Sequence, residues 1–358
     1  MQMENKKKKG TKVLFIILSV IIGLVLLLGT AAFIAFRHFY NKTNFVDDTE
    51  TPETTAVFSE SESEEAIATV ESEIEESIIS DNELTVEEVE EGALENIYNL
   101  LLIGVDRRDK SWNGNSDAMI LITINRNTKT IYMTSFMRDL YANIEGVGVR
   151  KLNHAYAVGA GPLLVNTLET NYGVYIDNYA SVDFSDIRQV IDVLGGVDIE
   201  IKDYELSEMA AVGIYNTGMQ HLNGAQALAY SRIRYHGNAD FERTQRQRTV
   251  LLCLMEKARS MSVLEMASMA DQVLPLVTHN LSSTETLNLM KDLPTVLKYK
   301  TEEIRIPADK EYHSYNEILI PNDINDTVTR LRERIYAKEA PKEEEASSEE
   351  GTSEDKNN

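Results

Sequence analysis

Five arginines lie within 17 residues of a chain whose formal net charge is −23: Arg232, Arg234, Arg243, Arg246 and Arg248. The first two belong to the segment YSRIR and share one face if that segment is extended. The others lie in a predicted helix, on which Arg243 shares a broad face with Arg246 and Gln247. Desolvated guanidinium groups need anions, so the two clusters favour convergence on one compact anion. The alternative is a solvated helix face, with Arg246 and Arg248 tying the helix to neighbouring loops.

Two aspartates lie at the ends of predicted strands. Asp106 ends the run NLLLIGVD, and Asp117 precedes the run AMILITIN. Ligand sites in open α/β sheets lie beyond the carboxyl ends of strands, and two carboxylates there can hold Mg²⁺, or Mn²⁺ in its place, together with substrate phosphates. The alternative is that each acid caps a turn or pairs with Arg107 or Arg108.

Two further polar groups follow predicted strands. Arg138 and Asp139 come directly after TIYMTSFM, where an arginine can fork onto phosphate and the aspartate can orient it or take a proton. The alternative there is a surface ion pair. The segment RKLNHAYAVGAG brings Lys151 and Asn153 together in what we interpret as a phosphate or sugar contact loop, whereas a lone histidine such as His154 is more typical of a structural role.

Two acids for a metal and several arginines for a polyanion point to pyrophosphate. Phosphoryl transfer needs mostly positioning and charge neutralisation. The sequence has no G-x-x-x-x-G-K-[ST] nucleotide-binding loop. A substrate that arrives already activated, such as a lipid-linked pyrophosphate, is therefore the hypothesis that the residues favour.

A membrane anchor is predicted near the N-terminus. Residues 13–36 contain no charged side chain, and as a helix they would be about 36 Å long, enough to cross a hydrocarbon core of about 30 Å. Five lysines precede this stretch, so the positive-inside bias predicts a cytoplasmic tail (1–12) and an extracellular remainder, as in a single-pass protein of a Gram-positive cell membrane. The alternative is a cleaved signal peptide, which usually has a shorter apolar core.

The large negative charge belongs to the flanks of the chain. Residues 43–92 hold 18 acids and no lysine or arginine, and residues 341–358 hold seven acids and two lysines. Such composition predicts a disordered acidic stalk over 37–94 and a disordered acidic tail over 341–358. The remaining domain, 95–340, has no broad basic face, so we expect no nucleic-acid partner.

That domain is expected to have an α/β (α+β) fold with a central mixed β-sheet flanked by helices. Strands are predicted at 99–106, 118–125, 130–137, 175–184 and 197–202. Helices are predicted at 161–173, from an N-cap at Ser185 to Gly195, and then at 225–231, 240–260, 262–277, 283–292 and 322–337. Early alternation of strands and helices followed by a helical half is typical of such layered folds.

The motifs resemble those of the LytR-CpsA-Psr family of cell-wall proteins, over roughly residues 97–260. The segments that carry the resemblance are, in order, LLIGVDRR, NSDAMILITIN, SFMRDLY, KLNHAYAVGAG, VDFSDIRQVIDVLGGVDI, LNGAQALAYSRIR and DFERTQRQR. One departure is Met137, where the family pattern usually has proline before Arg-Asp.

The resemblance implies a phosphotransferase that moves a glycopolymer, such as wall teichoic acid or capsular polysaccharide, from undecaprenyl pyrophosphate onto peptidoglycan, commonly the 6-hydroxyl of N-acetylmuramic acid. It implies Mg²⁺ on Asp106 and Asp117, with Asp139 as base for the acceptor. The pyrophosphate would be bound by the remaining candidates: Arg138, Arg232, Arg234, Arg243, Gln247, and Arg107 or Arg108. It also implies an apolar pocket for the lipid chain between sheet and helices. The candidates for its lining, which can equally be ordinary core, are Leu163, Leu164, Leu168, Val190, Val193 and Leu194.

Three other functions remain open. One is a non-catalytic wall-binding or scaffold protein, which the full set of acids and arginines disfavours. A polyprenyl-pyrophosphate pyrophosphatase would use the same residues with water as acceptor. A membrane-anchored transcriptional attenuator would need a DNA-binding surface, against which the predicted topology and charge argue.

Overall fold

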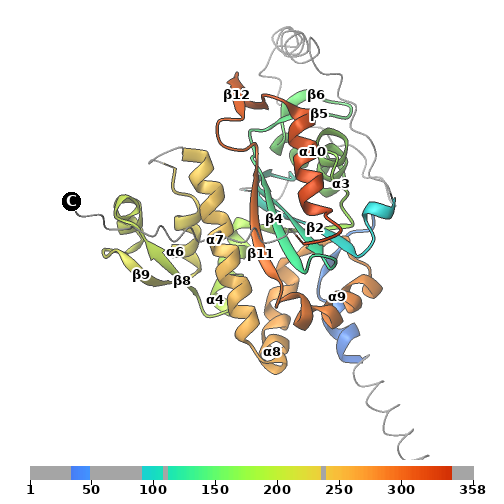
Figure 1. Cartoon of the computed structure of the whole chain (residues 1–358). Helices are drawn as coiled ribbons and strands as arrows, with labels where there is room; N and C mark the ends of the chain where they lie inside the picture. Colours follow the sequence, from blue (N-terminus) through green and yellow to red (C-terminus); the bar gives the residue numbers. More distant parts are fainter. Residues whose placement is uncertain (1–33, 49–90, 108–111, 235–238, 341–358) are drawn as a thin grey trace, which may run out of the picture.

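A seven-stranded mixed sheet forms the centre of the computed structural model, which describes residues 34–48, 91–107, 112–234 and 239–340 (Figure 1). The strand order is β1-β10-β7-β2-β3-β4-β11. Neighbours are parallel in the pairs β1/β10, β7/β2 and β4/β11 and antiparallel elsewhere. The strands are β1 Asn44–Phe45, β2 Ile97–Asp106, β3 Asn115–Asn125, β4 Thr130–Phe136, β7 Asn178–Asp183, β10 Thr278–His279 and β11 Lys300–Ile306. The predicted central mixed sheet is confirmed.

One face of this sheet packs into the main hydrophobic core. Leu101, Ile103 and Val105 of β2 point to this side and are almost fully buried. Helices α3 (Asn153–Tyr172) and α10 (Ile324–Ile335) cover it, together with the hairpins β5/β6 (Tyr141–Ile144, Gly148–Lys151) and β12/β13 (Tyr312–Tyr315, Ile318–Pro321).

The opposite face of the sheet is apolar but incompletely covered. Tyr98, Leu100 and Leu102 alternate with the buried residues of β2, yet they are only half-buried. They belong to a separate cluster with isoleucines of β3 and with Leu251, Leu252 and Met255 of helix α7 (Ala239–Ser260). We call this surface the half-covered face.

A smaller unit packs beside α7. Helices α4 (Phe184–Val193) and α6 (Gly224–Ser231) and the hairpin β8/β9 (Val197–Ile201, Gly218–Leu222) share their own hydrophobic cluster with α7 and the short helix α5 (Leu206–Met209). Gly224 lets α6 approach α4 closely, because a Cβ there would lie 2.0 Å from the carbonyl oxygen of Arg188. The unit therefore packs α6 against α7.

The remaining helices, α8 (Val263–Val273) and α9 (Ser283–Val296), lie at the opposite end of the sheet from the start of α7 (Figure 1). Helix α9 starts with a capping box in which the Ser282 hydroxyl accepts from the backbone N–H of Glu285 and the Glu285 carboxylate accepts from that of Ser282. Arg126 and Asp292, 2.7 Å apart, tie this helix to the turn between β3 and β4.

Several predicted boundaries were wrong. The helix predicted from residue 161 begins at Asn153 and is kinked at Gly159 and Ala160, so the predicted contact loop around Asn153 is largely helical. Helix α4 begins at Phe184, with Asp183 rather than Ser185 at the N-cap. Four strands within the supposedly helical last third, β10–β13, were missed because their apolar residues are few or irregularly spaced.

The predicted stalk was also wrong at its start. Residues 34–40 are helical, and Asn44–Phe45 form the edge strand β1, so residues 37–48 pack on the domain. The rest of the predicted stalk up to residue 90, the predicted tail, and most of the apolar stretch 13–36 lie outside the described residues. Within the described part of the chain, no helix has the length and apolar character needed to cross a membrane.

Candidate functional site

A β-bulge sets the direction of one of the two candidate metal ligands. Gly104 of β2 pairs with Ala118 of β3, but Val105 pairs with Ser116, so Asp117 is an extra residue on β3. Bulges re-aim side chains and occur often beside active sites. Asp117 and Ala118 are consecutive half-buried residues between buried neighbours, which places Asp117 on the same side of the sheet as the half-covered face.

Two aspartate–arginine pairs meet at this end of the sheet. Arg138, in the turn after β4, lies 3.1 Å from Asp117. Arg232, at the C-cap of α6, lies 3.4 Å from Asp106. The side-chain amide of Gln247 on α7 donates to the backbone carbonyl of Asp117 at 3.5 Å. The structure thus brings together five of the residues that the sequence singled out.

Phe184 provides a platform for this site that sequence reasoning missed. The guanidinium carbon of Arg232 lies 4.6 Å from the centre of the Phe184 ring, within cation–π range. A Cβ at Gly104 would lie only 3.1 Å from the same ring, so the glycine makes room for it. The signal was present in the segment VDFSD, where an aromatic residue follows the end of a strand.

A second polar network extends from Arg138 through Asp139. The Asp139 carboxylate lies 3.3 Å from Arg138 Nε and 3.4 Å from Lys151 Nζ. Lys151 also pairs with Glu317 at 2.9 Å, a partner that the sequence gave no reason to expect. Burial lowers the pKa of Lys151, but its hydrogen bond to Glu317 and the charge of Asp139 outweigh burial, so the pKa is raised and Lys151 stays a cation.

The other predicted phosphate ligands occupy different positions around the site. Arg243 lies one turn before Gln247 on α7 and is 3% exposed, and Arg234 is half-buried after α6. Arg107 bonds Asp183 through Nη2 at 2.6 Å and Nε at 3.2 Å, so it ties β2 to β7. Asn153 starts α3, and its backbone N–H donates to the carbonyl of Arg138 at 3.1 Å, which fixes the turn that carries Arg138. Arg108 lies outside the described residues.

Arg246 was wrongly assigned to the substrate. Its guanidinium is 3% exposed and bonds Glu205 at 2.7 Å, Glu242 at 2.6 Å and the carbonyl of Ile233 at 3.0 Å. All three donor nitrogens are therefore used within the fold. Arg248 is similarly held by Glu303 at 2.7 Å and Ser135 at 2.9 Å. Both residues join α7 to its neighbours, as the structural alternative expected.

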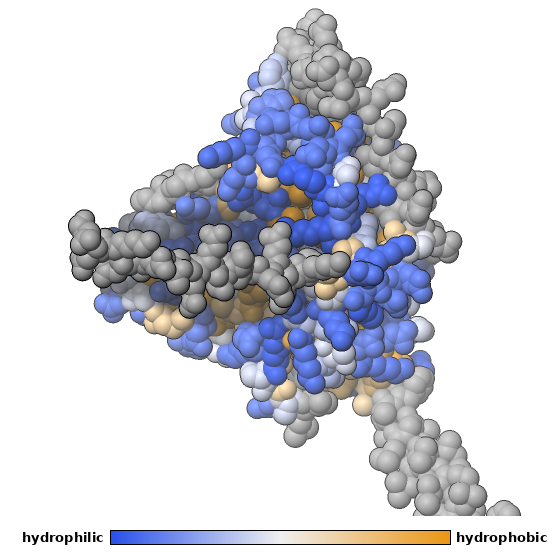
Figure 2. All heavy atoms as spheres, in the orientation of Figure 1, coloured by the Kyte–Doolittle hydropathy of each residue, from blue (hydrophilic) through white to orange (hydrophobic). Residues whose placement is uncertain are grey.

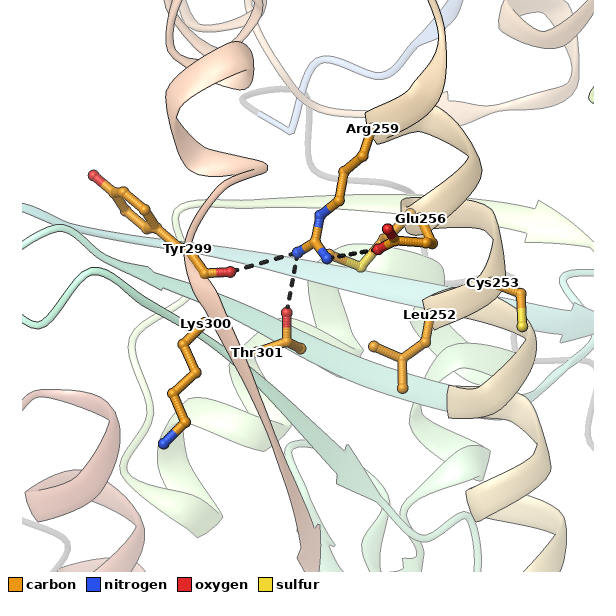
Figure 3. Close-up of a pocket in the computed structure, with 8 residues that line it drawn as sticks. Leu252, Cys253, Glu256, Arg259, Tyr299, Lys300 and Thr301 are labelled. Atoms are coloured by element: carbon orange, nitrogen blue, oxygen red, sulfur yellow. Dashed lines mark hydrogen bonds and ion pairs between the residues drawn. The ribbon is translucent and has the colours of Figure 1, made fainter. Parts of the chain in front are cut away.

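A cavity of about 450 Å³ opens between α7 and β11 (Figure 3). Leu252, Met255 and Tyr299 line it and also belong to the half-covered face. Arg259 reaches across it but bonds Glu256, the carbonyl of Tyr299 and the Thr301 hydroxyl. Cys253 is half-buried and lines the same cavity. The cavity therefore has an apolar wall and a paired cation, and none of the candidate site residues lines it.

The two aspartates fit a divalent cation that shares its ligands with phosphate. Asp106 and Asp117 lie on adjacent strands, their side chains are 33% and 13% exposed, and carboxylate oxygens are the ligands Mg²⁺ prefers. No group of three or more histidine, cysteine or acidic side chains within the described residues is arranged to hold a metal by itself. Mg²⁺ commonly uses only one or two carboxylates beside substrate phosphates, so the pair suits that mode.

The sequence of this chain is similar to the sequences of known proteins. The model of the LytR_cpsA_psr family matches residues 60–333. The polyisoprenyl-teichoic acid–peptidoglycan teichoic acid transferase TagU of Bacillus cereus is 34% identical over 215 residues, which is 59% of this chain and 68% of TagU. Biofilm regulatory protein A of Streptococcus mutans is 32% identical over 222 residues, 56% of this chain, and the match spans about half (53%) of that protein.

A solved structure extends the similarity to the fold. The LytR-CPS2A-psr family protein YwtF (TagT) with bound octaprenyl pyrophosphate lipid has a TM-score of 0.54 at 25% identity, and the match covers 71% of this chain and 95% of that one. The residues that the family model matches, 60–333, contain every strand of the central sheet except β1, together with the bulge and both aspartate–arginine pairs. The chain therefore belongs to the LytR-CpsA-Psr family.

Proposed function

We propose that this protein is a phosphotransferase that attaches a glycopolymer, such as wall teichoic acid or a capsular polysaccharide, to peptidoglycan. The donor is a polyprenyl pyrophosphate, undecaprenyl pyrophosphate in the cell, that carries the glycopolymer. The family membership, the activity in the name of TagU and the lipid bound to TagT support this function.

The observation that carries the proposal is the continuity between the half-covered face and the charged pairs. Strand β2 presents Leu100 and Leu102 on this face and ends at Asp106, four residues beyond Leu102 and on the same side. An apolar surface that the protein leaves partly exposed fits a hydrocarbon chain, and the arginines and aspartates at its end fit a pyrophosphate. A polyprenyl pyrophosphate has this combination of parts.

The lipid chain is assigned to the half-covered face rather than to the residues that the sequence suggested. Leu164 and Leu168 are fully buried in the main core, and Val190 is buried in α4, so they serve as ordinary packing. Tyr98, Leu251 and Tyr299 remain half-buried on the other side of the sheet. The polyprenyl chain would complete the burial of these side chains.

In the proposed reaction, an acceptor hydroxyl, the 6-hydroxyl of N-acetylmuramic acid, attacks the phosphorus that carries the glycopolymer. A new P–O bond to the acceptor forms, the bond to the bridging oxygen breaks, and polyprenyl phosphate leaves. Arg138 and Arg232 exchange their aspartate partners for phosphate oxygens and neutralise the charge that develops, with Arg234 and Arg243 as further cations. Asp139, held between Arg138 and Lys151, takes the proton of the acceptor hydroxyl.

Asp106 and Asp117 would hold Mg²⁺, which supplies charge neutralisation on the phosphates when bound. The proposed location is the outer face of the cell membrane, with residues 13–36 as the anchor, because that stretch is long and uncharged and follows five lysines.

A transfer assay tests this function. The full chain in detergent is given a polyprenyl-pyrophosphate-linked oligosaccharide, peptidoglycan fragments and Mg²⁺, and the products are followed by mass spectrometry. A phosphodiester-linked sugar on the fragments, lost in Arg138→Ala and kept in the surface variant Arg330→Ala, is the expected result. Release of free sugar phosphate without attachment would instead identify a pyrophosphatase. Inactivity on the lipid combined with DNA binding at physiological salt would favour a transcriptional attenuator.

A further inference from the structure

Residues 34–48 are built into the edge of the sheet. Strand β1 pairs with β10 in parallel, with Asn44 opposite Thr278 and Phe45 opposite His279. The Tyr40 hydroxyl donates to the carbonyl of Leu281 at 3.0 Å, and Lys42 pairs with Asp271 at 2.8 Å. The segment that directly follows the proposed anchor is therefore fixed to the domain and is not a free linker.

The far end of this segment is fixed as well. The carboxylate of Asp48 accepts from the Tyr179 hydroxyl at 3.0 Å and from the Asn280 side chain at 2.8 Å. The residues that flank the acidic stretch 49–90, Asp48 and Glu91, therefore both belong to the described domain. Because its two ends lie on one domain, this stretch does not set the distance between the domain and residue 34. Residues 34–48 therefore set the distance between the domain and the anchor.

Helix α9 presents an apolar face to solvent beside this segment. Leu287, Met290 and Leu293 are 36%, 54% and 40% exposed, and their spacing of three residues puts them on one broad face. The side facing the protein carries Val296, which is buried, and Asp292, which pairs with Arg126. The outer face bears Lys291 next to the apolar residues, and both acids of the helix, Glu285 and Asp292, lie on the inner side.

The apolar face and the anchor-proximal segment meet at the start of α9. Leu281, whose backbone carbonyl accepts the hydrogen bond from the Tyr40 hydroxyl, immediately precedes the N-cap Ser282. Ile34, which is 67% exposed, is the first described residue, and with Ala35 and Phe36 it forms the described part of the apolar stretch 13–36. Figure 2 shows orange side chains among blue ones at the lower right, where α9 and residues 34–48 lie in Figure 1.

We propose that the outer face of α9 docks on the lipid bilayer in which residues 13–36 are anchored. A helix with exposed leucine and methionine, a flanking lysine and no acid on that face suits the interface of an anionic membrane. The anchor supplies the location, because residues 34–48 hold α9 beside the point where the chain enters the membrane. No other partner needs to be recruited to cover the patch.

The docking gives the bilayer access to the half-covered face. The C-terminal end of α9 leads to Tyr299, which lines both the cavity in Figure 3 and the half-covered face. A polyprenyl chain leaving the membrane at α9 would enter there and run along the sheet towards Asp106. This consequence rests on the proposed function, whereas the docking itself rests only on the proposed anchor.

Lipid-borne quenching tests the docking without any activity measurement. The full chain with Cys253→Ala, which removes the only cysteine, carries one fluorophore at Met290→Cys or, as a matched control, at Met219→Cys. Both methionines are exposed, and Met219 lies on β9 in the smaller unit. Each protein is reconstituted in vesicles of phosphatidylethanolamine and phosphatidylglycerol whose acyl chains bear nitroxide. We expect quenching several-fold stronger at position 290 than at position 219.

Three results would overturn the docking. Equal, weak quenching at both positions means that α9 does not reach the bilayer. A label at position 290 that is shielded from aqueous iodide but not quenched by the lipid means that protein, such as a second copy, covers the face. A chain that does not remain with the vesicles removes the anchor and the docking together.

A second variant separates this inference from the proposed function. Leu287→Asp with Leu293→Asp should lower transfer from a long-chain donor in vesicles several-fold and leave transfer from a short-chain donor in solution unchanged. Arg138→Ala should abolish both reactions. If the α9 variant transfers from both donors as well as the unmodified protein does, the access route is contradicted. If the unmodified protein shows no transfer at all, the proposed function is contradicted, and the quenching result still tests the docking.

Discussion

Arg138 Nη1 and Asp117 Oδ1 lie 3.1 Å apart, although 21 residues separate them in the chain. The bulge in β3 turns Asp117 towards the turn after β4, where Arg138 begins the second network through Asp139 and Lys151. Arg138 thus links the proposed metal ligand to the proposed base. Its substitution should affect both halves of the site.

Replacing Arg138 with alanine should lower kcat for transfer by about 10²- to 10³-fold, the usual cost of removing one preorganised charge-stabilising donor. Arg138→Lys should recover only part of the loss, because an ammonium lacks the planar fork that binds two phosphate oxygens. Steady-state transfer rates measure both effects. A kcat for Arg138→Ala within twofold of that for Arg330→Ala, a change in an exposed surface pair, would remove Arg138 from the mechanism.

Asp117→Asn should weaken binding of a divalent cation at least about tenfold, because an amide supplies a neutral oxygen in place of a carboxylate. Electron paramagnetic resonance of Mn²⁺, titrated in the presence of a pyrophosphate lipid, measures the affinity directly. Asp292→Asn, which changes a surface carboxylate paired with Arg126, is the matched control and should bind as the unmodified protein does. Unchanged Mn²⁺ affinity in Asp117→Asn would exclude Asp117 as a ligand.

Arg246→Ala should destabilise the fold by about 3–5 kcal/mol, because it leaves the Glu205 carboxylate, 2% exposed, without its buried partner. Urea unfolding followed by circular dichroism gives the change in free energy. Replacing both members, Arg246→Met with Glu205→Leu, should restore much of the stability. If Arg246→Ala unfolds at the same urea concentration but loses affinity for the lipid, Arg246 belongs to the substrate site after all.

The edge of the sheet should loosen in acid. Burial lowers the pKa of His279 below its ordinary value of 6.5, and its Nδ1 accepts the backbone N–H of Leu281 at 3.1 Å. The unfolded chain takes up a proton near pH 6.5 while the folded histidine stays neutral. The free energy of unfolding therefore falls as the pH decreases from 6.5 to the lowered pKa of His279. Below that pKa, His279 causes no further decrease in the free energy of unfolding.

His279→Phe, which keeps a ring beside Tyr40 and Phe45, should remove this part of the pH dependence. Hydrogen exchange of the β1 and β10 amides between pH 7.5 and 5.5, corrected for intrinsic rates, reports the local opening. The same loss of protection in His279→Phe as in the unmodified protein would assign the effect to other groups.

The sequence predicted the centre of the fold well because its strands are long and apolar. The runs at 99–106, 118–125 and 130–137 lie within or across β2, β3 and β4. Strand β11, by contrast, reads KTEEIRI and is half polar because it lies at the edge of the sheet, so its pattern resembled a loop. Strand β1 is two residues long, and its pairing with β10 joins segments more than 230 residues apart.

The site was predictable where residues follow strand ends and less so on the helix. The grouping of Asp106, Asp117 and Arg138 at one end of the sheet was predictable because each lies beside a predicted strand. Helical spacing alone could not say which arginines of α7 face the site, since the buried partner of Arg246, Glu205, lies 41 residues earlier. The bulge that aims Asp117 and the Phe184 platform under Arg232 both arise from tertiary pairing, which local patterns do not specify.

We propose that the half-covered face and the charged pairs at its end bind one polyprenyl pyrophosphate. A crystal structure of the protein with a polyprenyl pyrophosphate and Mg²⁺ tests it most directly. We expect both phosphates between Arg138 and Arg232, the cation on Asp106 and Asp117, and the hydrocarbon chain over Leu100 and Leu102 of β2. Phosphates bound elsewhere, for example at Arg259 in the cavity between α7 and β11, would contradict it.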